Sequence, residues 1–123
     1  MNKANTKKLL EDFPDLYSEH TKPAMESLMC WGFDCYDGWF DLIYELSKKI
    51  GEYDPGVKAL QVKEKFGTLR FYIHGGDEKI DDIIDQAEQK SSEICEICGK
   101  LGRLRGKSWV IIACEDCWKE WGK

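Results

Sequence analysis

The sequence predicts an α+β protein, with a small helix–β-hairpin–helix body followed by a C-terminal zinc finger. Two paired CxxC motifs in the last third of the chain predict the finger. Apolar residues at helical spacing on either side of an alternating hairpin pattern predict the body. A chain of 123 residues has room for one compact domain and one metal-stabilised module. We therefore predict a body over residues 1–94 and a finger over residues 95–123.

The first half of the body is predicted to be mainly helical. Residues 1–29 indicate helix and loop, because two prolines interrupt any long helix. Residues 37–50 predict a better-defined helix, with Asp37 as its N-cap and Gly51 just beyond its end. Its apolar stripe consists of Trp39, Leu42, Ile43, Leu46 and Ile50.

A β-hairpin and a second helix are predicted next. Residues 59–63 and 68–73 each alternate apolar and polar side chains, and residues 64–67 join them. Asp77 then predicts the N-cap of a helix that runs toward the CxxC motifs. The apolar residues of this helix are Ile80, Ile83, Ile84, Ala87 and Ile94.

The clearest chemical signal is the spacing CxxC, 15 residues, CxxC. One CxxC turn brings two sulfurs within about 2.3 Å of an ion, and a second turn completes a tetrahedron. The first residues mix charges where an export signal needs an apolar stretch, so we expect a reducing compartment. There, paired CxxC motifs favour metal binding over disulfides. The predicted ligands of one structural Zn²⁺ ion are Cys95, Cys98, Cys114 and Cys117.

The remainder of the finger is predicted to be a hairpin and a short helix. Residues 102–105 and 108–113 form the hairpin around Gly106 and Lys107, and the helix follows the second cysteine pair. This order is that of a treble-clef finger, with a zinc ribbon as the alternative. Four protein ligands leave no open coordination position, so the site is predicted to stabilise structure and not to catalyse. An iron–sulfur cluster also takes four thiolates, but nothing else in the sequence indicates electron transfer.

Cations and aromatic side chains are concentrated in the finger. This composition is typical of a contact with nucleic acid or an acidic partner, although surface solubility explains the same charges. The last two tryptophans are interpreted as a hydrophobic seal between finger and body, with an exposed partner contact as the alternative. The candidate partner-binding residues are Arg103, Arg105, Lys107, Trp109, Trp118 and Trp121.

Charge and hydropathy narrow the classes of partner. Residues 1–94 carry 12 Lys/Arg against 19 Asp/Glu, whereas residues 95–123 carry 6 against 4. An acidic body argues against non-specific electrostatic binding of the whole chain to a nucleic-acid phosphate backbone. The longest apolar run, residues 109–114, is far too short to cross a bilayer. We expect a cytoplasmic protein with no membrane partner.

Two further residue pairs carry weaker signals. Cys30 and Cys35 are predicted to be small buried side chains, with a redox pair or a second metal site as alternatives. Asp34 and Asp37 could bind a ligand or partner, but a solvated surface explains them. The sequence contains no Ser/His/Asp set, phosphate loop or open metal site, so we predict that the protein is not an enzyme.

Three segments have distinctive motifs: residues 29–40, residues 62–73, and the stretch from Ala87 through the CxxC finger. Through them the chain resembles, over roughly residues 13–118, a family of small uncharacterised proteins encoded by phages and prophages. Some relatives end the second ligand pair with Cys-x-x-His where this chain has Cys-Glu-Asp-Cys, and either set binds zinc. The resemblance implies a phage-like setting and no established activity.

Together these features favour a non-enzymatic accessory protein that binds a host or phage protein, with inhibition of a host defence system as one form of that role. The alternative is a nucleic-acid-binding regulator that uses the basic hairpin of the finger. The sequence does not specify the partner or the oligomeric state.

Overall fold

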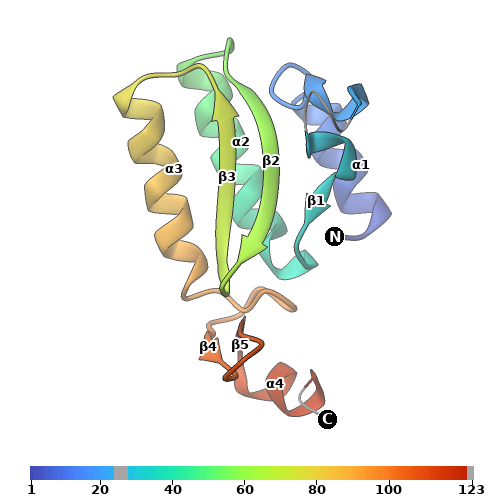
Figure 1. The fold of residues 1–123 in the computed structure, drawn as a ribbon, viewed down its shortest axis with the longest axis vertical. Helices are drawn as coiled ribbons and strands as arrows, with labels where there is room; N and C mark the ends of the chain where they lie inside the picture. The colour runs from blue at the N-terminus through green and yellow to red at the C-terminus, as the bar shows by residue number, and fades with distance from the viewer. Residues whose placement is uncertain (24–27, 122–123) are drawn as a thin grey trace.

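The computed structural model describes residues 1–23 and 28–121 and has a mixed α+β architecture. A three-stranded sheet in the order β1–β2–β3 forms the centre of the body. In Figure 1, α2 lies behind this sheet and α3 runs beside β3. The finger lies beyond the end of the sheet where β2 turns into β3. No helix in the described part of the chain is both long and apolar enough to cross a membrane.

The N-terminal segment is helical at first and then irregular, as predicted. Helix α1 (Lys3–Asp12) is capped by Asn2, whose side chain accepts a hydrogen bond from the backbone N–H of Asn5 at 2.8 Å. The helix ends before Pro14, which cannot continue it. Short elements then lead across the body: η1 (Ser18–Thr21), η2 (Leu28–Trp31) and β1 (Phe33–Asp34).

The predicted helix at residues 37–50 is present, but with different ends. A 3-10 turn, η3 (Asp37–Trp39), precedes α2 (Phe40–Tyr53). The Asp37 carboxylate does not cap α2, because it accepts hydrogen bonds from the Asn2 N–H at 2.8 Å and the Asn5 side chain at 3.1 Å. Gly51 lies inside the helix, so the predicted end was also wrong. The apolar stripe is confirmed, with Trp39, Ile43, Leu46 and Ile50 fully or almost fully buried and Leu42 partly so.

The predicted hairpin is confirmed as β2 (Lys58–Lys65) paired antiparallel with β3 (Thr68–His74). A bulge between Ala59 and Gln61 shifts the register, so Ala59 and Val62 are both buried and strict alternation fails. Strand β1, which pairs parallel with β2 through two residues, was not predicted.

Helix α3 (Glu78–Ser91) begins at the predicted cap, since the Asp77 carboxylate accepts from the N–H groups of Lys79 and Ile80. It also protects the outer edge of the sheet. The Leu69 N–H donates to Ser91 Oγ and the Phe71 N–H donates to Glu88 Oε2, both at 2.9 Å. Side chains of α3 therefore satisfy backbone donors of β3 that have no neighbouring strand.

Candidate metal centre

The finger is built from two cysteine turns with a small hairpin between them. The first turn follows α3, and the second leads into α4 (Glu115–Trp121). The predicted hairpin is present but shorter, as β4 (Arg103–Arg105) paired antiparallel with β5 (Ile111–Ala113). A five-residue loop joins these strands and begins at Gly106, whose φ of 99° suits glycine.

The fold brings the four predicted metal ligands together. Their sulfur atoms all lie within 4.8 Å of one another. A tetrahedron with metal–sulfur bonds of about 2.3 Å has sulfurs about 3.8 Å apart. The Sγ atoms of Cys98 and Cys114 are 3.7 Å apart, which fits that geometry. The cluster can therefore hold a metal ion with an all-thiolate ligand set, as the spacing predicted.

Backbone amides in each turn point toward the first sulfur of the pair. The Cys98 N–H lies 3.5 Å from the sulfur of Cys95, and the Cys117 N–H lies 3.4 Å from that of Cys114. Burial disfavours the Cys95 thiolate, but backbone N–H groups outweigh that effect and lower its pKa to about 7. This stabilises the deprotonated form that a metal ion requires.

Two glycines allow the backbone of the first turn to be enclosed from both sides. A Cβ on Gly38 would lie 2.1 Å from the carbonyl oxygen of Cys95, where no side chain fits. The Gly38 N–H donates to the carbonyl of Glu96 at 2.7 Å. On the other side, a Cβ on Gly102 would lie 2.9 Å from the Cys95 nitrogen. Gly38 precedes α2 in the body, so the body itself helps to position the metal ligands.

The finger also shares packing and hydrogen bonds with the body. Ile112 of β5 is buried in the body's hydrophobic core. The Glu96 N–H donates to the Ile112 carbonyl at 2.8 Å, and the indole N–H of Trp39 donates to the Ile94 carbonyl at 2.9 Å. The segment around the first cysteine turn is therefore bonded to both parts. The boundary at residue 94 stays a prediction.

Glu96, between the first two cysteines, has a buried carboxylate that the sequence analysis did not single out. Only 2% of the residue is exposed, and its Oε2 accepts a hydrogen bond from the Tyr36 N–H at 3.1 Å. Burial raises the pKa of Glu96 to about 7, and the Tyr36 hydrogen bond only partly opposes that shift. No sequence signal distinguishes this glutamate from the many exposed ones.

The candidate contact residues of the β4–β5 hairpin differ in solvent exposure and in hydrogen bonding. Arg103 and Lys107 are exposed, and 72% of Trp109 is exposed. Arg105 is half-buried, and its Nε donates to the carbonyl of Ala113 at 2.8 Å. Arg105 therefore supports the hairpin, which leaves Arg103 and Lys107 as its two freely presented cations.

Of the two C-terminal tryptophans, Trp118 packs in the finger's own small core and Trp121 lies outside it. Trp118 is half-buried against a cluster formed by Cys95, Ile111 and Ala113. Trp121 is 38% exposed and stacks on Trp118, with ring centroids 6.1 Å apart. This packing is within the finger, whereas the sequence interpretation placed both indoles between finger and body.

The weaker candidates do not converge on a second metal site. Cys35 is buried as predicted, but Cys30 is exposed, and both are free thiols. Asp34 is exposed, while Asp37 is bonded to α1. Within residues 1–23 and 28–121, the four-cysteine cluster is the one group of potential ligands close enough to hold a metal ion.

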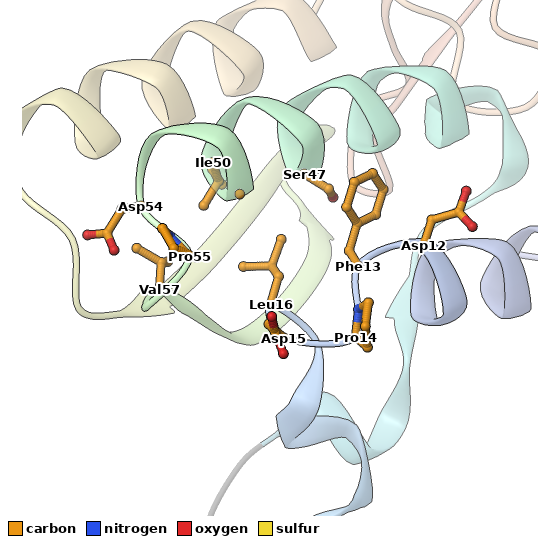
Figure 2. A pocket seen from close by; sticks show the side chains of 11 residues that line it. Asp12, Phe13, Pro14, Asp15, Leu16, Ser47, Ile50, Asp54, Pro55 and Val57 are labelled. Carbon is orange, nitrogen blue, oxygen red and sulfur yellow. The ribbon is translucent and has the colours of Figure 1, made fainter.

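A small pocket lies between the end of α2 and the loop after α1, but its lining does not indicate a binding or catalytic site. Figure 2 shows the side chains that line it. The volume of the cavity is about 150 Å³. Asp12 at its rim accepts hydrogen bonds from Tyr44 and Lys8, and Asp54 accepts one from the Gly56 N–H. These carboxylates are held by neighbouring groups and are not directed at a ligand.

Comparison of the chain with protein-family models, with curated proteins and with solved structures found no match.

Proposed function

We propose that the four cysteines bind one Zn²⁺ ion as a closed structural site in a treble-clef-like finger. The close set of four sulfurs supports the metal, and the order of cysteine turn, hairpin, cysteine turn and helix supports the finger class. Purified, unoxidised protein should contain about one zinc per chain. A Cys95→Ala/Cys98→Ala variant that still retains one zinc would contradict this ligand set.

We propose further that the zinc-stabilised fold is a non-enzymatic binding protein whose ligand is another protein. The observation that carries this proposal is a set of large apolar side chains exposed around the finger hairpin and the β2–β3 turn. Such side chains cost solubility when they stay uncovered, and aromatic ones are typical binding anchors. They are Phe66 (74% exposed), Leu101 (83%), Leu104 (56%) and Trp109 (72%).

The Phe66 turn and the finger hairpin form one surface. A Cβ on Gly67 would lie 2.7 Å from the Leu104 side chain and 3.6 Å from the Val110 side chain. The apolar residues at the tip of the body hairpin therefore adjoin those of the finger. A partner that covers this surface would contact both parts at once.

The resemblance to phage and prophage proteins supplies the setting of the proposal. In that setting the chain is a cytoplasmic accessory protein that engages a host or phage protein, and blocking a host defence system is the form of the role that we propose. The alternative is a nucleic-acid-binding regulator, which the exposed cations Arg103 and Lys107 favour.

Affinity purification from the native host tests the proposal, with wild type and Trp109→Ala as paired baits. We expect wild type to recover a stoichiometric protein and the variant to bind it more weakly by about 2 kcal/mol. The double variant Arg103→Ala/Lys107→Ala spares Arg105 and its bond to the hairpin. Salt-sensitive, sub-micromolar DNA or RNA binding that this double variant loses, with no protein recovered, would favour the alternative.

A further inference from the structure

A second pocket lies where the body meets the finger, and its lining includes Asp34, Cys35 and Trp109 from the sequence analysis. Its volume is about 230 Å³. One wall comes from β1 and the residues after it, another from the end of β2, and a third from the first cysteine turn and the finger loop. The residues that matter for its chemistry are Asp34, Tyr36, Glu64, Glu96 and Trp109.

The Glu96 carboxylate is the most informative group in this pocket. It is almost fully buried, yet within the described residues its one hydrogen bond is the bond from the Tyr36 N–H to Oε2. No described Lys, Arg or His forms an ion pair with it. A buried carboxylate ordinarily has several donors or a cation beside it, so Glu96 has unused capacity facing the pocket.

The lining also includes two further carboxylates and two exposed aromatic rings. Asp34 is exposed, and Glu64 accepts one hydrogen bond, from the Gly67 N–H at 2.7 Å. Trp109 and Tyr36 are largely exposed beside them. The Met1 amino group, which donates to the Cys35 carbonyl, is the one cationic group among the lining residues. Three carboxylates and the exposed rings of Tyr36 and Trp109 thus line the pocket together with a single ammonium group.

We propose that this pocket accepts the guanidinium group of an arginine from a basic segment of the partner protein. A guanidinium offers five N–H donors in a plane, which suits several carboxylates and also stacks on an indole. The pocket supplies both kinds of contact, through Glu96 and Asp34 and through Trp109. This inference rests on the proposed protein-binding function and specifies the chemistry of the partner.

Two other occupants fit the pocket less well. Nucleic acid would bring phosphates toward three carboxylates, which repel them. A divalent metal ion needs oxygens grouped around one point, and these carboxylates do not form such a group. The acidic pocket and the exposed cations Arg103 and Lys107 would therefore select different ligands.

The zinc-loaded protein of residues 1–123 allows a direct test with the blocked tripeptide acetyl-Gly-Arg-Gly-amide. The control peptide carries citrulline, which has the shape of arginine without its charge. We expect the arginine peptide to shift the NMR signals of the Tyr36 amide and the Trp109 indole, and the citrulline peptide to leave them in place. Glu96→Gln keeps an acceptor for the Tyr36 N–H, so its fold and zinc content should persist while peptide affinity falls about tenfold or more.

Asp34→Asn provides a second variant at an exposed position, and Glu52→Gln on the exposed face of α2 controls for overall charge. We expect Asp34→Asn to weaken peptide binding and Glu52→Gln to leave it unchanged. Equal shifts with both peptides, or no shift at Tyr36 and Trp109, would overturn the pocket assignment. If the host protein is also recovered equally by wild type and Glu96→Gln, the protein-binding function stands and only its arginine contact fails.

Discussion

At the scale of single residues, the first cysteine turn depends on a glycine that lies more than fifty positions earlier in the chain. Gly38 leaves the space that the carbonyl groups of Cys95 and Glu96 occupy. Gly51 is the opposite case. It lies in the last turn of α2, and a Cβ there would meet nothing within 4 Å. The two glycines thus form a matched pair for mutation.

We predict that Gly38→Ala destabilises the zinc-loaded protein by about 3 kcal/mol, because the added methyl group must displace backbone. Gly51→Ala should be neutral or stabilising by up to about 1 kcal/mol, because alanine favours helix. Urea unfolding of both variants measures the difference. Equal midpoints would mean that the first cysteine turn does not need the close approach of Gly38.

The six cysteines are predicted to fall into three reactivity classes. Cys30 is exposed and unligated, so it should be alkylated readily in the native protein. Burial raises the pKa of Cys35 to about 12, so its reactive thiolate is scarce. The proposed zinc ligands should react only after chelation. Mass spectrometry should therefore count one label in native protein, four more after chelation, and the last after denaturation.

The Cys30→Ser variant is the control for this assignment, since it should remove the single native label. Two labels in the native zinc-loaded protein would place Cys35 at the surface or leave one of the four cluster cysteines unligated.

At the scale of elements, the β2–β3 turn contains a conformation that its sequence does not favour. Phe66 has φ 54° and Gly67 has φ 88°, the pattern of a two-residue type I′ turn. Asparagine or glycine is preferred at the first position, and a bulky residue there is strained. Phe66 is 74% exposed, so it gains little from burial in exchange. Its presence supports a binding role for the surface that it shares with Leu104.

We predict that Phe66→Asn stabilises the protein by about 1 kcal/mol, because asparagine tolerates the left-handed conformation. Phe66→Leu keeps the strain and should give no such gain. Both variants lose the aromatic ring, but only Phe66→Asn relieves the strain. Comparing their thermal unfolding temperatures therefore separates the two effects. If both variants have the same stability, the turn is not strained by its side chain. Both should bind the protein partner more weakly than wild type.

Elements defined by local patterns could be predicted, and those defined by distant contacts could not. The stripe of α2, the β2–β3 hairpin and the Asp77 cap of α3 each follow from nearby residues. Strand β1 is only two residues long and is defined by its pairing with β2, far along the chain. Asp37 looked like a cap but bonds to α1, because a tertiary partner replaced the local one.

The candidate site also has features that the local sequence predicts and features that only distant contacts define. The spacing of the cysteines was sufficient to predict that their sulfurs converge. The buried state of Glu96 depends on Tyr36, sixty residues away, and no periodicity or motif could reveal it. The close approach of Gly38 to the first cysteine turn could not be predicted either, since a glycine before a predicted helix has many ordinary explanations.

At the scale of the whole molecule, finger and body contact each other at the β2–β3 turn, through Ile112 and at a hydrogen-bonded seam. Each part has its own cluster of buried residues, although Ile112 of the finger packs in the larger one. The seam consists of Tyr36 and Gly38 on the body side, bonded to Glu96 on the finger side. The body's sheet, in contrast, is bonded to α3. Unfolding caused by loss of the metal ion should therefore extend from the finger to the seam and leave the sheet folded.

We predict that chelation releases the finger and the seam while the sheet and α3 persist, because a structural zinc ion supplies much of a finger's folding free energy. Amide hydrogen exchange can follow each region. The Cys95 and Glu96 amides report the finger, and those of Tyr36 and Gly38 report the seam. These four should lose protection together as the chelator concentration rises. The amides of Leu69 and Phe71, which donate to α3, should stay protected. If they exchange at the same chelator concentration as Cys95, the chain is one cooperative unit and the boundary at residue 94 is wrong.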